Sequence, residues 1–194
     1  TRLGELGGRA RPSWSSQTGR LVRGYTSSVD DSLQPFGLQI PHSLQLDVAP
    51  ASSVPLVVWL HGRGDQLTDL HFIDRCMFPG AGAAFQGLAA ADALTDKAIV
   101  LHAFGRSCLG YKSAAETDIY EAVAAAQHMY PCIDADRMAL AGFSMGGSGT
   151  YHLAAHRPDQ WAVAHAGAAF AETYHYTKGG GASGGANDQS GAPW

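Results

Sequence analysis

The sequence lacks any apolar run approaching the roughly 18 residues that a membrane-spanning helix requires. It is also poor in charge, because only 15% of its residues are charged and the net charge is −4. A weakly acidic chain has no excess of positive charge with which to attract nucleic acid or an anionic lipid surface. We therefore expect neither a nucleic acid nor a membrane as partner.

Cysteine is scarce as well. The three cysteines, Cys76, Cys108 and Cys132, have the spacing of neither a zinc site nor a redox pair. We expect buried free thiols, with room for one disulfide, so cysteine usage leaves the compartment undecided. No signal peptide opens the chain, but because the first residue is Thr1 rather than Met, the compartment is not decided by this either.

The length and the apolar content are those of one globular domain. The chain has 194 residues, of which 45% are hydrophobic, enough for a substantial core. From residue 179 onward the composition shifts to Gly, Ala, Ser, Asn and Asp, with little left to bury. We predict a folded domain over residues 1–177 and a Gly-rich flexible tail over residues 178–194.

Short apolar runs alternate with stretches of helical composition. An antiparallel hairpin is predicted from two alternating runs, 20–26 and 34–40, within a region of strands at about 20–48 that ends in a short strand at 43–48. Further strands are predicted at 54–60, 97–102, 137–142 and 161–167, and helices at 69–77, 83–93, 113–130 and 149–156. The third of these helices opens on Ser113 and Glu116, the sequence of a capping box. This alternation predicts an α/β fold, a three-layer sandwich around a mostly parallel sheet.

One short motif carries the chemistry. The apolar run that ends at Gly142 leads through Phe143-Ser144-Met145-Gly146 directly into a segment of helical composition. A Gly-x-Ser-x-Gly sequence between a strand and a helix is typical of a nucleophile elbow, which exposes the serine hydroxyl at a helix N-terminus. A second match at residues 181–185 has no strand before it and no helix after it, so we assign it to the tail.

A second motif follows the strand predicted at 54–60. It reads His61-Gly62-Arg63-Gly64, a flexible turn at the carboxyl end of an apolar strand. Ligand-binding residues in parallel α/β sheets gather at these strand ends. We therefore expect this turn to lie close to Ser144.

Together these motifs resemble the α/β-hydrolase superfamily. More narrowly, they are similar to its esterase and lipase branch, which includes prolyl-oligopeptidase-like enzymes, feruloyl esterases and polyhydroxyalkanoate depolymerases. The likeness covers about residues 54 to 170 and is carried by three stretches, residues 56–65, 136–147 and 151–159.

The resemblance implies a role for each motif. Ser144 would be the nucleophile, and the backbone N–H of Met145 would form one half of an oxyanion hole. The other half would come from Arg63 or Gly62, while His61 would shape the turn rather than act as a base. No cofactor and no metal are implied. The implied substrate is a small-molecule or polysaccharide-linked ester, the implied location is secreted or periplasmic, and the oligomeric state is left open.

The chain departs from this family after the serine. In the α/β-hydrolase fold the catalytic acid and histidine follow the serine, on loops after further strands. Here only the strand at 161–167 follows, so we interpret the chain as a hydrolase domain truncated after its sixth strand, without the C-terminal strands. The remaining candidates are Asp188 as the acid and His165 or His175 as the base. Without a clear base, we expect hydrolysis through Ser144 to be crippled.

Three alternatives remain. The chain could be a non-catalytic binding module with the same fold, or a serine peptidase of the prolyl-oligopeptidase type. It could also be a metal-dependent hydrolase, because His152 and His156 stand four residues apart on a predicted helix. The zinc-protease pattern requires Glu directly after the first histidine, where this chain has Leu153, and the sequence identifies no third ligand.

Overall fold

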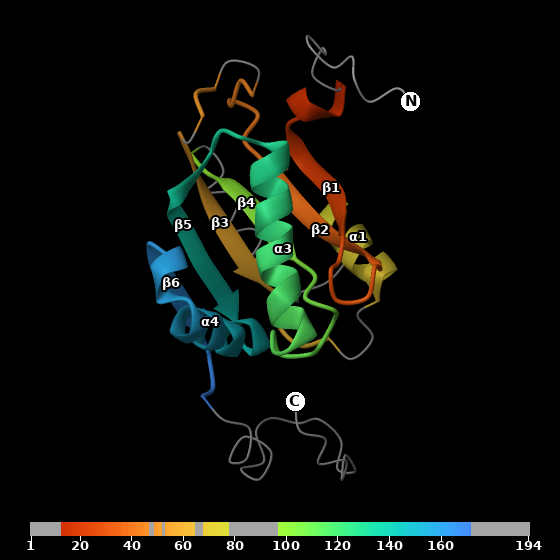
Figure 1. Cartoon of the computed structure of the whole chain (residues 1–194), viewed down its shortest axis with the longest axis vertical. Coiled ribbons are helices and arrows are strands. Elements are labelled where there is room, and N and C mark those ends of the chain that lie inside the picture. The colour runs from red at the N-terminus through yellow and green to blue at the C-terminus, as the bar shows by residue number, and fades with distance from the viewer. Residues whose placement is uncertain (1–12, 47–48, 52, 65–67, 78–96, 172–194) are drawn as a thin grey trace.

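The computed structural model describes residues 13–46, 49–51, 53–64, 68–77 and 97–171, and these form one sheet flanked by helices (Figure 1). The sheet has six strands in the order β1-β2-β4-β3-β5-β6. In chain order the strands are β1 (Gly19–Thr26), β2 (Leu33–Ile40), β3 (Val54–Leu60), β4 (Ile99–Ala103), β5 (Ile133–Phe143) and β6 (Val163–Gly167).

The strand directions agree with the sequence pattern. β1 and β2 form an antiparallel hairpin, and β2 also pairs antiparallel with β4. The other pairs, β3 with β4, β3 with β5 and β5 with β6, are parallel. The predicted hairpin and the predicted mostly parallel sheet are therefore confirmed.

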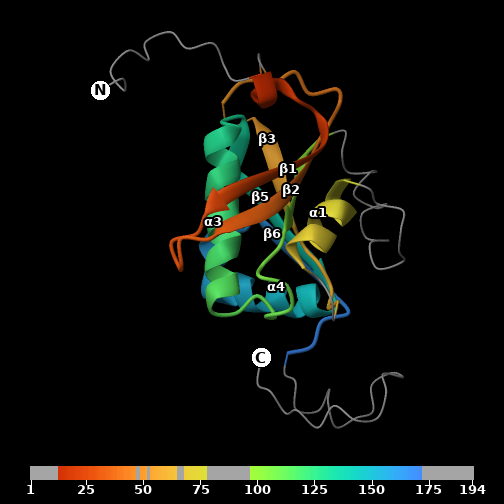
Figure 2. The ribbon, with the colours of Figure 1, turned by 90° about the vertical axis from the view of Figure 1, so that its right-hand side faces the viewer.

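Helices cover both faces of this sheet. Figure 2 shows α3 (Ala114–Met129) on one side of the strands and α1 (Asp69–Met77) on the other. A third helix, α4 (Met145–His156), packs against β5 and β6. Two short 3-10 helices, η1 (Ser13–Ser16) and η3 (Pro158–Gln160), complete the described elements. None of the described helices is long and apolar enough to cross a bilayer.

The core lies between α3 and the sheet. β4 is buried at all five positions, while β3 alternates between buried and half-buried residues. On α3 the predicted apolar stripe of Ile119, Val123 and Ala126 is buried and continues to Tyr130 just after the helix. Burying an Ile or Val side chain contributes about 1.5–3 kcal/mol to stability, so this stripe fixes α3 against the sheet.

Two local predictions are wrong. Residues 43–46 form no strand, and Leu44 N–H donates to the carbonyl of Pro41 in a turn. The predicted capping box is also missing, because Ser113 has a φ of 53° and its side chain makes no capping hydrogen bond. Glu116 instead lies within hydrogen-bond distance of two imidazoles on α4, one at each carboxylate oxygen.

Some element boundaries also differ from prediction. β5 begins at Ile133 rather than at residue 137, whereas α4 begins at Met145, directly after Ser144, as the strand–serine–helix pattern predicts. The helix predicted at 83–93 and the tail predicted at 178–194 lie outside the described residues. The division into a domain over residues 1–177 and a tail therefore stays a prediction.

β4 carries a buried histidine. His102 is 3% exposed, and neither ring nitrogen has a hydrogen-bond partner in the described part of the chain. Burial, with the nearby positive charge of Arg20 and the ring of His61, lowers the pKa of His102 to about 3. The side chain is therefore neutral in the folded protein at pH 7, and folding opposes its protonation.

This burial predicts how acid acts on stability. Because the pKa of His102 is lower in the folded protein, the unfolded chain binds the extra proton as the pH falls from about 6.5 toward 3. The stability that His102 contributes is full above pH 6.5 and is lost through this window. We expect His102→Gln to lower the slope of unfolding free energy against pH by about 1.4 kcal/mol per unit between pH 6 and 4.

Urea unfolding at a series of pH values measures this slope. The exposed His71 on α1 provides the matched control, and His71→Gln is expected to keep the parental slope. An identical slope in the parent and in His102→Gln would contradict the prediction.

Candidate active site

Ser144 stands alone between a strand and a helix. β5 ends at Phe143, and α4 begins at Met145. Ser144 has a φ of 56° and a ψ of −115°, a backbone conformation that costs a non-glycine residue about 1–3 kcal/mol. Its N–H donates to the carbonyl of Gly167 in β6 at 2.9 Å, and its own carbonyl accepts from Ser148 N–H at 3.0 Å. The half-buried serine is thus held at a sharp turn by backbone contacts on both sides.

The two glycines of the motif are required by close approach of the backbone. A Cβ on Gly142 would overlap the carbonyl of Gly146, and a Cβ on Gly146 would overlap the carbonyl of Leu60 at the end of β3. These neighbours are backbone atoms of the sheet and the elbow, which cannot turn aside as a flexible side chain does. The Gly-x-Ser-x-Gly spacing therefore allows α4 to start directly against β3.

The turn after β3 lies against the elbow, as the sequence predicted. Leu60 and Gly142 are register partners, so β3 and β5 end at the same edge of the sheet (Figure 1). A Cβ on Gly62 would lie 3.8 Å from the Cβ of Ser144 and 3.5 Å from the carbonyl oxygen of Phe143. The backbone of this turn is thus next to Ser144, where it was predicted to form one half of an oxyanion hole.

His61 holds this turn in place. The side chain is 5% exposed, with Nδ1 at 2.7 Å from the carbonyl oxygen of Gly62 and Nε2 at 3.0 Å from that of Phe104. Burial lowers the pKa of His61, although the hydrogen bonds to both carbonyls act in the opposite direction. A buried imidazole held between two carbonyls supports the predicted structural role of His61.

The loop between β4 and α3 supplies two supports that the motifs did not indicate. The buried Tyr111 donates its hydroxyl to the carbonyl of His61 at 2.9 Å, and its ring packs on His61 edge to face. Cys108 donates to the carbonyl of Gly64 at 2.9 Å and accepts from the N–H of Gly64 at 3.3 Å. Both residues lie more than forty positions from the turn in sequence, so no local pattern could have identified them.

This loop is fixed in turn to the N-terminal hairpin. Arg106, with a φ of 52°, forms an ion pair with Asp30 at 2.7 Å in the β1–β2 turn. Its Nε lies 3.0 Å from Asp118 on α3, whose side chain is 2% exposed. A buried carboxylate that lost its cation would be costly, so Arg106 ties the hairpin, the loop and α3 together.

The first backbone N–H groups of α4 face the same region. Met145 is the first residue of the helix, and the opening N–H groups of a helix have no partner within the helix itself. They also carry the positive end of the helix dipole. An N–H at this position is suited to a negatively charged oxygen next to Ser144.

Comparison with known proteins agrees with this geometry. A sequence model of the prolyl oligopeptidase family matches residues 102–181. No curated protein matches the chain.

Solved structures share its fold. The crystal structure of a thermostable esterase has a TM-score of 0.54 and 22% identity over 75% of this chain and 40% of its own. A ferulic acid esterase has a TM-score of 0.57 and 20% identity over 79% of this chain and 61% of its own. FphF, fluorophosphonate-binding serine hydrolase F of Staphylococcus aureus, has a TM-score of 0.57 and 16% identity over 81% of this chain and 60% of its own.

The chain has the α/β-hydrolase fold. Its strand order, its mostly parallel sheet and its turn at Ser144 all fit this assignment. The chain spans between 40% and 61% of the length of these three structures.

The predicted acid and base are not brought to the serine within the described residues. His165 lies in β6 as the register partner of Ala141, with its side chain exposed, and no hydrogen bond joins it to Ser144. His175 and Asp188 lie outside the described residues. Among the residues that the structure describes, no side chain forms a hydrogen bond with the Ser144 hydroxyl, so the acid and base stay predictions.

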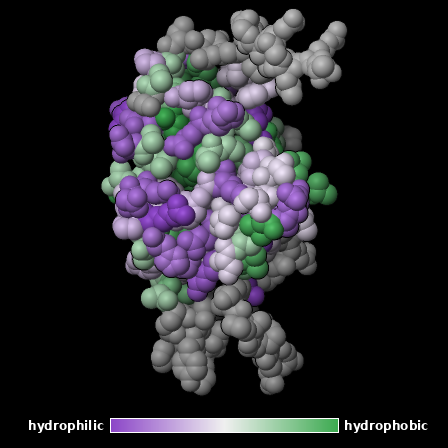
Figure 3. All heavy atoms as spheres, in the orientation of Figure 1, coloured by the Kyte–Doolittle hydropathy of each residue, from purple (hydrophilic) through white to green (hydrophobic). Residues whose placement is uncertain are grey.

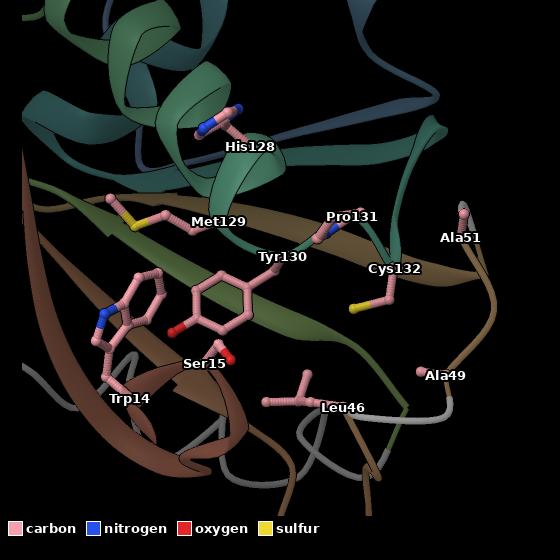
Figure 4. Close-up of a pocket in the computed structure, with 10 residues that line it drawn as sticks. All are labelled: Trp14, Ser15, Leu46, Ala49, Ala51, His128, Met129, Tyr130, Pro131 and Cys132. Carbon is pink, nitrogen blue, oxygen red and sulfur yellow. The ribbon is translucent and has the colours of Figure 1, made fainter. Parts of the chain in front are cut away.

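A large hollow lies at the opposite end of the sheet. It has a volume of about 470 Å³ and is lined by Trp14, Leu46, Tyr130 and Cys132 among others (Figure 4). Cys132 directly precedes β5, whereas Ser144 directly follows it, so the two sites are separated by the length of that strand. This hollow is therefore not the place where Ser144 would meet a substrate.

The packing of the elbow gives a testable prediction. We expect Gly146→Ala to lower the free energy of unfolding by at least about 2 kcal/mol, because its methyl group would press on the backbone of Leu60 and His61. Gly62→Ala is the matched control, with contacts no shorter than 3.5 Å and an expected change within about 0.5 kcal/mol. Chemical denaturation measures both, and equal stability of the two variants would refute the close approach.

Proposed function

We propose that this chain carries the nucleophile and the oxyanion-binding groups of a serine hydrolase that cleaves carboxylic esters. The observation that carries the proposal is the single serine at a strained strand-to-helix turn, flanked by the turn at Gly62 and by the N-terminus of α4. Backbone N–H groups of the turn at Gly62 and of the first turn of α4 would supply the donors that acyl transfer requires beside a nucleophilic hydroxyl.

In the proposed reaction, Ser144 Oγ attacks the carbonyl carbon of the ester while its proton passes to a base. The resulting oxyanion accepts hydrogen bonds from the N–H of Met145 and from an N–H of Arg63 or Gly62. Removing one such donor from a serine hydrolase costs about 2.7–4 kcal/mol of transition-state stabilisation. The tetrahedral intermediate then expels the alcohol, which takes up the proton, and water hydrolyses the acyl-enzyme at Ser144.

We propose further that the chain as printed reacts slowly. No described imidazole forms a hydrogen bond with Ser144, and in another serine hydrolase the loss of the histidine lowers kcat by about a million-fold. The oxyanion-binding groups alone still leave a measurable rate above that of water. A covalent probe with a good leaving group, whose stable adduct accumulates over hours even when the reaction is slow, is therefore the suitable first test.

An ester is favoured over a peptide as the substrate. Two of the similar structures are named as esterases, one of them a ferulic acid esterase, which supports a small-molecule or polysaccharide-linked ester. Another is named as a putative dipeptidyl aminopeptidase IV. The match to the prolyl oligopeptidase family supports a serine peptidase as the second candidate. Parallel assays with p-nitrophenyl esters and with chromogenic peptides separate the two.

Covalent labelling tests the proposed nucleophile. A fluorophosphonate probe is expected to modify the folded protein once per chain, at Ser144, and Ser144→Ala is expected to abolish labelling. Ser148→Ala is the matched control: Ser148 lies one helical turn further along α4, where its hydroxyl donates to the carbonyl of Phe170, and its loss is expected to leave labelling intact. Intact-mass spectrometry measures the adduct. A folded sample that stays unlabelled would contradict the hydrolase and favour a non-catalytic binding module.

The support from Cys108 can be tested with the same probe. Cys108→Ala removes both hydrogen bonds to Gly64 and loosens the turn beside Ser144, so we expect labelling to slow by roughly five- to tenfold, the equivalent of about 1 kcal/mol. Cys132→Ala changes a buried thiol at the far end of β5 and is expected to keep the parental rate. Equal labelling rates for the two variants would show that Cys108 does not support the turn beside Ser144.

A further inference from the structure

A carboxylate and two imidazoles meet on the surface of the molecule. Glu116 on α3 has one carboxylate oxygen 2.8 Å from Nε2 of His152 and the other 2.9 Å from Nδ1 of His156. The two rings stand 4.0 Å apart, centroid to centroid. The three potential ligand atoms all lie within 4.8 Å of one another.

Two helices hold these side chains in place. His152 and His156 are four residues apart on α4, so they project from the same face of the helix, one turn apart. Glu116 stands in the first turn of α3, facing that turn of α4. The sequence indicated only the histidine pair, and the fold supplies the third group from 36 residues earlier in the chain.

We propose that Glu116, His152 and His156 bind one divalent transition-metal ion with the ligand preferences of Zn²⁺. Imidazole nitrogen and carboxylate oxygen are both zinc ligands, and three protein ligands leave a fourth position for water. Zinc bonds of about 2.0–2.2 Å in a tetrahedron place ligand atoms about 3.4 Å apart. The present separations of 2.8 and 2.9 Å would widen by about half an ångström, a change within reach of rotamer adjustments.

The charge and exposure of the cluster suit an ion arriving from solvent. The side chains of Glu116 and His152 are 20% exposed and that of His156 is 51% exposed. Figure 3 shows hydrophilic side chains gathered at the lower left of the visible face, where Figure 1 places α4 beside α3. The carboxylate oxygens of Glu116 supply the negative charge of the cluster.

Neighbouring groups set the limits of the site. Arg157 lies with its guanidinium 4.6 Å from the ring centre of Tyr120, and both residues share a hollow of about 340 Å³ with Glu116. The positive charge of Arg157 repels a nearby metal ion. We therefore expect the affinity for zinc to be lower than that of a closed four-ligand site.

The site differs from a metalloprotease centre. Leu153, at the position where the protease pattern has its general base, is fully buried in the core. His152 lies eight residues after Ser144 on α4, about 12 Å along the helix axis. An ion here would cross-link α3 and α4 and thereby steady the helix that begins at the elbow. This role does not depend on the proposed hydrolase activity.

Titration of the whole chain with zinc, after treatment with a chelator, tests the proposal. Calorimetry at neutral pH is expected to show one saturable site, and zinc at 100 times its dissociation constant is expected to raise the thermal midpoint by about 5 °C. Glu116→Gln, His152→Ala and His156→Ala are each expected to weaken binding at least tenfold. His128→Ala, an exposed histidine in the last turn of α3, is the matched control and is expected to bind zinc as the parent does.

Cobalt(II) used in place of zinc distinguishes this site from the thiols. Ligation by nitrogen and oxygen gives no sulfur-to-metal charge-transfer band, whereas binding at Cys108 would give one. Circular dichroism verifies that each variant is folded. No saturable binding, a thiolate band, or equal affinity in Glu116→Gln and the parent would overturn the proposal and leave the cluster as a hydrogen-bonded contact between two helices.

Discussion

The site depends on how closely three backbone segments approach one another where β3 and β5 end. The first turn of α4 rests on the carbonyl of Leu60, and no side-chain atom fits between them. Close contact of this kind leaves few alternative positions for the intervening residue, so the strain at Ser144 is maintained by the packing around it. The position of the serine at this turn is thus a consequence of backbone geometry in the sheet.

The turn at Gly62, after β3, is the second backbone segment beside Ser144. A turn rich in glycine has few side-chain contacts of its own, so its shape has to be imposed from outside. His61, Tyr111 and Cys108 do this through hydrogen bonds to backbone groups of the turn, and Arg106 anchors the loop that carries two of them. A turn of flexible composition can therefore keep a fixed position, because hydrogen bonds from neighbouring residues hold it.

Much of this fold could be predicted from the sequence, because it is expressed in local patterns. The apolar runs of β3 and β4, the stripe on α3 and the strand–serine–helix order around Ser144 each depend on neighbours within a few residues. The strand predicted at 43–48 failed because its alternation was too short to outweigh the turn that begins at Pro41. The capping box failed because Glu116 has its partners on another helix, which no local pattern reveals.

The parts of the site that escaped prediction share one property. Cys108 and Tyr111 act on a turn more than forty residues away, and Glu116 joins His152 across 36 residues, so all of them depend on the tertiary fold. The histidine pair on α4 was visible in the sequence, but its partner was not. The acid and base of the hydrolase stay predictions, since two of the three candidates lie outside the described residues and His165 makes no contact with the serine.

The position of β3 in the sheet has a consequence for synthesis of the protein. β3 pairs on one side with β4 and on the other with β5, and both of these strands follow it in the chain. During translation, the segment Val54–Leu60 therefore leaves the ribosome with both edges unpaired until Ala103 has been made, and its second edge stays unpaired until Gly142 has been made. An uncharged strand rich in valine and leucine with an open edge can pair with another chain. The strand that supports the turn at Ser144 is thus exposed to intermolecular pairing during folding.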